Sequence, residues 1–312
     1  LEPLDLGGKW VSLRSTSGKD VTFLSSNGSG TVITAESGEE SNTEVVGFTI
    51  KDASIGISIG SDEEVTIRDC YITDTNYPIE VYADNDINLF NITLGLNGLQ
   101  AVKLNGENIG YSNSSITRTW NINNLAVNPE GDLDVQSSSS SATATLKIVG
   151  NAELAFSADK YLRIGENSSN NRGAIQATGV TFTALDTSLG WGGIYFNDYS
   201  DDGSSLIDSC IVEYADDGIY CASASPTITN STIRNNTDGI DADASSQPTI
   251  TGNTFTGNTR PVSVYAARIN NTISGNTYSG NTKDYIEVQG DYIDDNGTFV
   301  WAKDNGPYIG VG

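Results

Sequence analysis

The 312-residue chain is strongly acidic, with 40 Asp and Glu residues against 16 Lys and Arg residues, no histidine and a formal net charge of −24. Nucleic acids and anionic membrane surfaces attract cationic proteins, so we expect neither as a partner. No apolar run reaches the length that membrane insertion requires. Only 37% of the residues are hydrophobic, which is little for one globular core of this size and suits a narrow core built along an elongated chain.

The first 43 residues contain strand-like runs, such as Lys9 to Leu13 and Asp20 to Phe23, joined by Ser and Gly turns. The chain starts at Leu1 and contains no methionine. We therefore expect a processed mature form or a piece of a longer protein.

Isoleucines between residues 45 and 122 predict a first set of coils. One expected column has spacings of 22, 20 and 24 residues and contains Ile50, Ile72, Ile92 and Ile116. A second expected column contains Ile67, Ile87 and Ile109. The uneven spacing indicates insertions between coils.

The pattern breaks between residues 123 and 142, which include a serine run at 137–141. Such a shift in composition marks a boundary. We expect two β-helical segments, 1–130 and 131–312, with the regular repeats at 205–293.

The stretch from Pro226 to Ile286 repeats itself with a period of 21 to 23 residues. Each unit has three short runs rich in β-branched residues, such as Thr227 to Thr229, separated by Asn, Gly, Asp and Ser. These runs predict strands and the breaks predict turns. The three expected apolar columns are Ile207, Ile228, Ile250 and Ile273; Ile211, Ile233, Phe255 and Tyr278; and Ile219, Ile240, Val262 and Ile286.

Three strands and three turns in about 22 residues form one coil of a parallel β-helix, whose units must stack to bury their apolar faces. The repeats resemble those of right-handed parallel β-helix proteins, the architecture of pectate lyases, polygalacturonases and phage tailspikes. That resemblance implies an all-β, right-handed solenoid of three-strand coils, either as a single solenoid or as two stacked segments.

The sequence contains three cysteines, Cys70, Cys210 and Cys221, without any Cys-x-x-Cys motif. We expect all three to be buried, and the sequence leaves open a disulfide between Cys210 and Cys221. Eight Asn-x-Ser/Thr sequons are candidates for glycosylation if the protein is secreted. They start at Asn27, Asn91, Asn113, Asn167, Asn230, Asn235, Asn270 and Asn296.

Acidic residues near two adjacent strands are the catalytic candidates. The run from Asn236 to Asp238 is similar to the Asn-Thr-Asp signature of polygalacturonase-type glycoside hydrolases, whose chemistry needs one protonated and one ionised carboxyl group. The candidates are Asp216, Asp217, Asp238 and Asp241. Asp217 and Asp238 should stack on adjacent coils, close enough for one pKa to rise.

The same residues also fit a structural interpretation, because one turn position contains Asp217, Asp238, Arg260 and Asp284 in successive coils. Arg260 would then lie between two carboxylates. A second position contains Asn236, Asn258 and Asn281, whose amides could bond along the stack. We favour this ladder, and therefore expect no required cofactor and no enzymatic activity.

Two further features suggest ligands. Calcium is the ion that an oxygen-rich loop could hold at Asn197, Asp198, Asp201 and Asp202. Tyr195 and Tyr220 should face outwards on adjacent coils, where stacked aromatic rings can bind sugars.

No helix that would cap either end of the solenoid is visible in the sequence. We therefore expect an extracellular or cell-surface structural protein that self-associates head-to-tail, or a module of a longer parent chain. The alternatives are a carbohydrate-active enzyme or carbohydrate-binding module, of the lyase or hydrolase type, and an adhesin or tailspike-like module.

Overall fold

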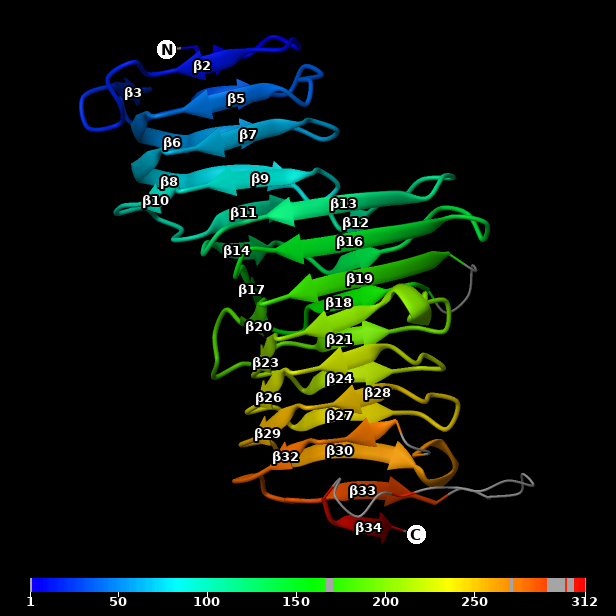
Figure 1. The fold of residues 1–312 in the computed structure, drawn as a ribbon. Coiled ribbons are helices and arrows are strands. Elements are labelled where there is room, and N and C mark those ends of the chain that lie inside the picture. The colour runs from blue at the N-terminus through cyan, green and yellow to red at the C-terminus, as the bar shows by residue number, and fades with distance from the viewer. Residues whose placement is uncertain (1, 167–170, 270–271, 291–300, 302–305, 312) are drawn as a thin grey trace. The chain divides into compact units, whose positions relative to one another are not determined.

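The computed structural model describes residues 2–166, 171–269, 272–290, 301 and 306–311. Parallel strands dominate it, and they form three sheets, here called A, B and C (Figure 1). The all-β solenoid expected from the repeats is therefore confirmed. Contacts divide the chain into unit 1 (residues 1–107, 118–131 and 148–154) and unit 2 (residues 108–117, 132–147 and 155–312). The boundary expected at residue 130 stays a prediction.

Unit 1 is built from strands of sheets A and B. Its sheet A strands are β1 (Leu4–Asp5), β3 (Phe23–Ser25), β4 (Thr31–Ala35), β6 (Thr49–Ile59), β8 (Tyr71–Tyr82), β10 (Thr93–Leu94), β11 (Val102–Asn105) and β14 (Ala126–Pro129). Its sheet B strands are β2 (Ser12–Arg14), β5 (Thr43–Val46), β7 (Val65–Arg68), β9 (Ile87–Phe90) and β13 (Ile116–Asn121), the last of which begins in unit 2.

Two long strands explain why unit 1 departs from a regular repeat. β6 has 11 residues and β8 has 12, and they pair along most of their length. Each contains an aspartate with a positive φ, Asp52 at 51° and Asp74 at 53°, a conformation that Asp tolerates better than most residues. The first part of β8 pairs with β10 and its last part with β11.

Both isoleucine columns expected in unit 1 are partly wrong. Ile50 does pair with Ile72, but Leu94, not Ile92, lies over Ile72. In sheet B, Leu89 rather than Ile87 lies over Ile67. The two remaining residues of these columns are not in them either: Ile116 lies in β13 of sheet B, and Ile109 lies in β12 of sheet C. Constant spacing fails as a guide here because the strands and loops vary in length.

Unit 2 has strands in all three sheets. Those of sheet A are β17 (Glu153–Phe156), β20 (Thr181–Ala184), β23 (Ile211–Glu213), β26 (Thr232–Arg234), β29 (Thr254–Thr256) and β32 (Thr277–Tyr278). Those of sheet B are β16 (Thr143–Val149), β19 (Arg172–Thr178), β22 (Leu206–Asp208), β25 (Thr227–Thr229), β28 (Thr249–Thr251) and β31 (Ile273–Ser274). Parts of β16 and β17 belong to unit 1.

Sheet C of unit 2 carries the residues that matter most below. Its strands are β12 (Asn108–Ile109), β15 (Leu133–Val135), β18 (Tyr161–Ile164), β21 (Gly193–Phe196), β24 (Asp217–Cys221), β27 (Asp238–Ala242), β30 (Arg260–Tyr265), β33 (Ile286–Gln289) and β34 (Tyr308–Val311). Two short 3₁₀ helices complete the described elements, η1 (Asp202–Ser204) and η2 (Ala266–Arg268).

The regular repeats stack in the expected register, with one correction. The column from Ile207 to Ile273 and the column from Ile219 to Ile286 are confirmed residue by residue. In the remaining column Val212, not Ile211, lies over Ile233 and is fully buried. The spacing there is 21 residues, so a period of 22 selects the wrong neighbour.

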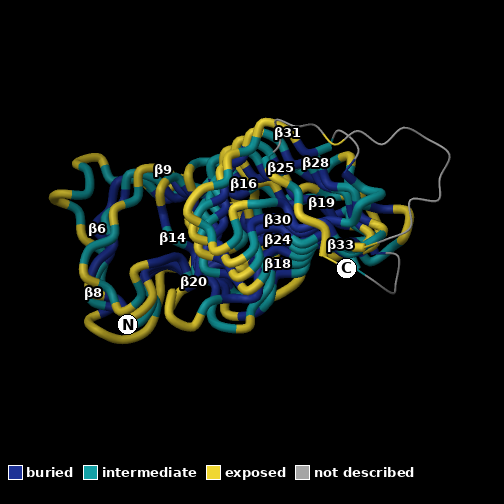
Figure 2. Tube along the Cα trace, turned by 90° about the horizontal axis from the view of Figure 1, so that it is seen from below, coloured by how far each residue is buried: buried dark blue, intermediate teal, exposed yellow. Residues whose placement is uncertain are grey.

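The buried residues, dark blue in Figure 2, lie along the strands, and most of them are apolar. All three cysteines are free and buried, as expected of small core residues, so the structure contains no bond between Cys210 and Cys221. Burial raises the pKa of each thiol. Within the described residues no helix is both long enough and apolar enough to cross a membrane.

The expected asparagine ladder is confirmed at one turn of unit 2. Asn236 donates to the Asn258 side chain through its backbone N–H (3.0 Å) and through Nδ2 (3.1 Å). Asn258 donates to Asn281 in the same way, at 3.0 Å in both bonds. Nδ2 of Asn236 also donates to the Val212 carbonyl, and Nδ2 of Asn258 donates to the Ile233 carbonyl. The ladder thus satisfies the polar groups of a buried turn.

We predict that Asn258→Ala destabilises the protein by about 2 to 3 kcal/mol, because it leaves several buried donors and acceptors without partners. Chemical denaturation followed by circular dichroism measures this change. Thr259→Ala, at an exposed neighbouring position, is the control and should change stability by less than about 0.5 kcal/mol. Equal effects of the two variants would contradict a stabilising ladder.

Candidate functional site on sheet C

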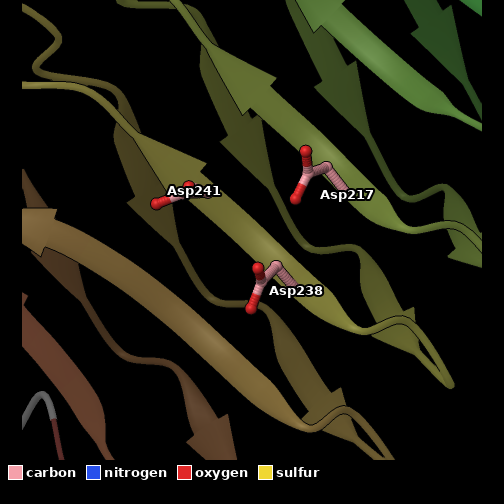
Figure 3. A group of neighbouring side chains, drawn as sticks. All are labelled: Asp217, Asp238 and Asp241. Carbon is pink, nitrogen blue, oxygen red and sulfur yellow. The ribbon is translucent and has the colours of Figure 1, made fainter.

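Three aspartates meet on the outer surface of sheet C. Asp217 begins β24 and pairs in register with Asp238, which begins β27. Asp241 follows three residues later on β27, and all three side chains lie together (Figure 3). One carboxylate oxygen from each lies within 4.8 Å of the others. The structure therefore brings together three of the four acids proposed from the sequence.

Tyr195 of β21 holds the first of these aspartates. Its hydroxyl donates to Asp217 Oδ2 at 3.0 Å. Burial, together with the charges of Asp238 and Asp241, raises the pKa of Asp217 to about 6, although the bond from Tyr195 opposes that rise. Burial and the charge of Asp217 raise the pKa of Tyr195 as well, so the phenol remains a donor.

Arg260 at the start of β30 holds the second aspartate. Its Nε and Nη2 donate to the two oxygens of Asp238, each at 2.6 Å, in a bidentate pair. Nη1 donates to Glu287 at 3.0 Å, and Asp241 lies 3.8 Å from Nη2. The bonds to Asp238 are the main reason that the pKa of Arg260 is raised.

The expected position of Arg260 between two carboxylates needs one correction. Asp238 is a partner as predicted, but Glu287 of β33 takes the place expected for Asp284. Asp284 instead accepts the N–H groups of Gly280 and Asn281 at the turn before β33. It therefore stabilises the turn rather than extending the charge ladder.

Asp241 has an environment of its own. Burial is the main cause of its raised pKa, and the neighbouring carboxylates Asp238 and Glu287 add to the rise. A hydrogen bond from Ser263 and the charge of Arg260 oppose it. Asp216, the fourth candidate, is exposed and lies just before β24, outside the group of three.

Three tyrosines extend the site along the sheet. Tyr195 pairs with Tyr220 in register, as expected, with ring centroids 5.0 Å apart. Tyr161 packs edge-on against Tyr195 at 4.9 Å. Gly192 leaves room for the Tyr161 ring, because a Cβ there would overlap it. The rings form one half-buried aromatic strip.

A cation and two hollows flank this strip. Arg163 of β18 lies over the Tyr161 ring, 5.4 Å from its centroid. One hollow of about 370 Å³ is lined in part by Asp134, Arg163 and Tyr195, and another of about 540 Å³ in part by Tyr161 and Asp216. We call the outer surface formed by these side chains the sheet C face. Its members are Asp132, Asp134, Tyr161, Arg163, Tyr195, Asp217, Tyr220, Asp238, Asp241, Arg260, Ser263 and Glu287.

The chemistry of the sheet C face is that of polar rings and acceptors. Aromatic faces pack against the apolar side of a sugar ring, and carboxylates accept its hydroxyl protons. Asp217, whose pKa is raised, also lies beside Asp238, which is paired with Arg260, and glycoside hydrolysis uses two neighbouring carboxyl groups in different environments. Carboxylate oxygens grouped in this way are equally the donor set that hard cations prefer.

The loop expected to hold calcium has other partners in the structure. Asn197 donates to the Gly165 carbonyl at 3.0 Å, Asp201 pairs with Arg172 at 3.5 Å, and Asp202 accepts the Ser200 hydroxyl. Asp198 is exposed. Calcium at this loop stays a prediction.

Five of the sequon asparagines lie in the described part of the chain, and all five are exposed: Asn27, Asn91, Asn113, Asn230 and Asn235. Four of them, Asn27, Asn91, Asn230 and Asn235, have positive φ. Asn167, Asn270 and Asn296 lie outside the described residues. Glycosylation stays a prediction for all eight.

Sequence reasoning missed six residues of the face: Asp132, Asp134, Tyr161, Arg163, Ser263 and Glu287. The alternation from Tyr161 to Ile164 could have indicated that Tyr161 and Arg163 face outwards together. Glu287 was missed although Ile286 was placed correctly beside Val262, because Arg260 reaches Glu287 diagonally between β30 and β33.

A scan against protein families matches residues 164–305 to a model described as a right handed beta helix region. This match agrees with the parallel coils of unit 2 and with the architecture expected from the repeats. No curated protein and no solved structure gave a significant match to the chain.

We predict that Asp217→Asn raises the melting temperature at pH 7 to 8 but not near pH 4. The folded-state pKa of about 6 lies above the ordinary value for Asp, so folding favours the protonated carboxyl and stability is lost as pH rises from about 4 to 6. Asparagine does not titrate. Thermal unfolding across this range measures the difference, with the exposed Asp216→Asn as control; a gain at pH 4 as large as at pH 8 would contradict the prediction.

Proposed function

We propose that this right-handed β-helix repeat protein is an extracellular structural protein whose sheet C face binds glycan chains. The observation that carries the glycan part is the strip of Tyr161, Tyr195 and Tyr220 beside the carboxylates of Asp217, Asp238 and Asp241. These side chains project from successive strands, so they present a repeating surface rather than one deep pocket. A repeating surface suits a polymer of sugar units.

Rigidity supports the same proposal. Tyr195 is fixed by Asp217, Asp238 is fixed by Arg260, and Tyr161 is seated on Gly192. Side chains that are already ordered lose little conformational entropy when a ligand binds. The sheet C face is therefore organised for binding before the glycan arrives.

We predict that Tyr195→Ala and Tyr220→Ala each weaken glycan binding by about tenfold, because each removes one stacking surface worth about 1 to 1.5 kcal/mol. Affinity electrophoresis or calorimetry against soluble β-glucan, mannan, galactan and chito-oligosaccharides measures it. Tyr82→Ala, at an exposed tyrosine of β8 in unit 1, is the control. Failure of the wild-type protein to bind any of these glycans would contradict the proposal.

Hydrolysis is the second candidate function, favoured by one observation: Asp217 has a raised pKa next to Asp238, which Arg260 pairs. The carboxylate oxygens of Asp217 and Asp238 lie within 4.8 Å of each other, close to the short separation of retaining glycosidases. In this scheme Asp217 donates its proton to the glycosidic oxygen as Asp238 attacks the anomeric carbon and the glycosidic bond breaks, and Asp217 then takes a proton from the water that releases the sugar from Asp238. New reducing ends in the same incubations, absent with Asp217→Asn and lost as pH rises through about 6, would support hydrolysis. Glycan binding without new reducing ends would contradict hydrolysis and leave the proposal of a glycan-binding structural protein intact.

The structural part of the proposal rests on apolar side chains that are exposed on unit 1 and on β34 of unit 2. Trp10, Val21 and Phe23 of unit 1 are 61%, 62% and 55% exposed. Ile309 and Val311 of β34 are 44% and 38% exposed. Two different apolar surfaces favour a heterologous contact between copies, which can propagate head-to-tail.

We predict that the protein self-associates as its concentration increases, and that Trp10→Ser with Phe23→Ser weakens this association because it removes apolar area from one side of the contact. Analytical ultracentrifugation measures the mass distribution. Leu96→Ser, at another exposed apolar residue of unit 1, is the control. A wild-type protein that remains monomeric at high concentration would contradict head-to-tail assembly.

A further inference from the structure

We propose that Asp132 and Asp134 set the charge selectivity of the sheet C face: by holding Arg163 in ion pairs, they make the face accept glycans without acidic groups and reject uronic-acid chains. This inference rests on the glycan binding proposed above. It names the class of glycan and two residues that determine it.

Arg163 is the side chain that would otherwise bind an acidic sugar. It lies over the Tyr161 ring and lines the hollow beside Tyr195, where a stacked sugar would bring a carboxylate within reach. A free guanidinium in that place would bind a carboxylate through two parallel hydrogen bonds.

The guanidinium is already occupied by two carboxylates of the chain. Its Nη1 donates to Asp134 Oδ1 at 3.0 Å, and its Nη2 contacts Asp132 Oδ2. Asp132 is itself fixed, since its Oδ1 accepts the backbone N–H of Tyr161 at 3.0 Å. An acidic sugar would therefore have to displace an ordered aspartate to reach Arg163.

The second arginine of the face is occupied in the same way. Arg260 pairs with Asp238 and Glu287, and Glu287 also binds Lys283 at 2.6 Å. The sheet C face thus contains six carboxylates and two arginines, with Lys283 beside it as a further partner of Glu287: the carboxylates are those of Asp132, Asp134, Asp217, Asp238, Asp241 and Glu287, and the arginines are Arg163 and Arg260.

The excess of negative charge acts at both short and long range. A uronate bound along the tyrosine strip would place its carboxylate near Asp217 and Asp241, and both arginines among the defined members of the sheet C face are already paired. Like charges in contact oppose binding. At longer range, the net charge of −24 slows the approach of any polyanion. Neutral glycans meet neither obstacle.

The test compares each neutral glycan of the binding panel with the same glycan oxidised at its primary hydroxyl to the uronate. These pairs differ only in charge. We expect the wild-type protein to bind the oxidised form about tenfold more weakly or worse. Asp132→Asn with Asp134→Asn frees Arg163 while keeping the acceptor for Tyr161, and should reduce that difference at least about threefold.

Two further variants separate the role of Arg163 from a general charge effect. Asp20→Asn with Glu40→Gln removes two exposed acids of unit 1 and should leave the selectivity unchanged. Adding Arg163→Gln to the variant that carries Asp132→Asn and Asp134→Asn should abolish its improved binding of the oxidised glycan. Circular dichroism and binding of the neutral glycan show that each variant is folded.

The outcomes distinguish this inference from the proposed function. Equal or tighter binding of the oxidised glycans to the wild-type protein would overturn the charge selectivity and leave glycan binding intact. If Asp20→Asn with Glu40→Gln improves binding of the oxidised glycans as much as Asp132→Asn with Asp134→Asn does, the role of Asp132 and Asp134 is overturned. No binding of any glycan, neutral or oxidised, would overturn the proposed function and this inference with it.

Discussion

Parallel hydrogen bonding between successive coils is the constraint on which the rest of each unit depends. Stacked strands lie about 4.8 Å apart, and every side chain lies next to its equivalent in the neighbouring coil. Inside unit 2 this register joins Ile219 to Ile240 and Val262. At the turns it joins Asn236 to Asn258. A residue type that suits one coil therefore suits the next, which explains why the sequence repeats.

The same register produces the sheet C face where the repeat is broken. It places Asp217 next to Asp238, a pairing of like charges that opposes stability unless neighbours compensate. The compensation comes from residues that do not repeat: Tyr195 donates to Asp217, and Arg260 pairs with Asp238. The site thus arises where the outward-facing residues at equivalent positions of sheet C change type from one coil to the next.

Much of this arrangement could be predicted from the sequence, and the errors have physical causes. The core columns of the regular repeats, the asparagine ladder and the Asp217–Asp238 pair followed from periodicity because the turns there keep nearly constant length. Ile211 was placed in the core because one spacing is 21 rather than 22. The Arg260–Glu287 contact and the Tyr195–Asp217 bond were missed because both run diagonally between strands, whereas the register predicts only direct neighbours.

The buried asparagine ladder fixes the positions of the strands that carry the aspartates of the sheet C face. Asn236 Oδ1 accepts the backbone N–H of Ala215 at 2.8 Å, two residues before Asp217, and Asn236 itself lies two residues before Asp238. The ladder therefore fixes the points at which β24 and β27 begin, and with them the separation of the two carboxylates. Because these turns are hydrogen-bonded on the inside, the outer side chains can vary without loss of register. A stable repeat can in this way carry a site whose residues are individually unfavourable neighbours.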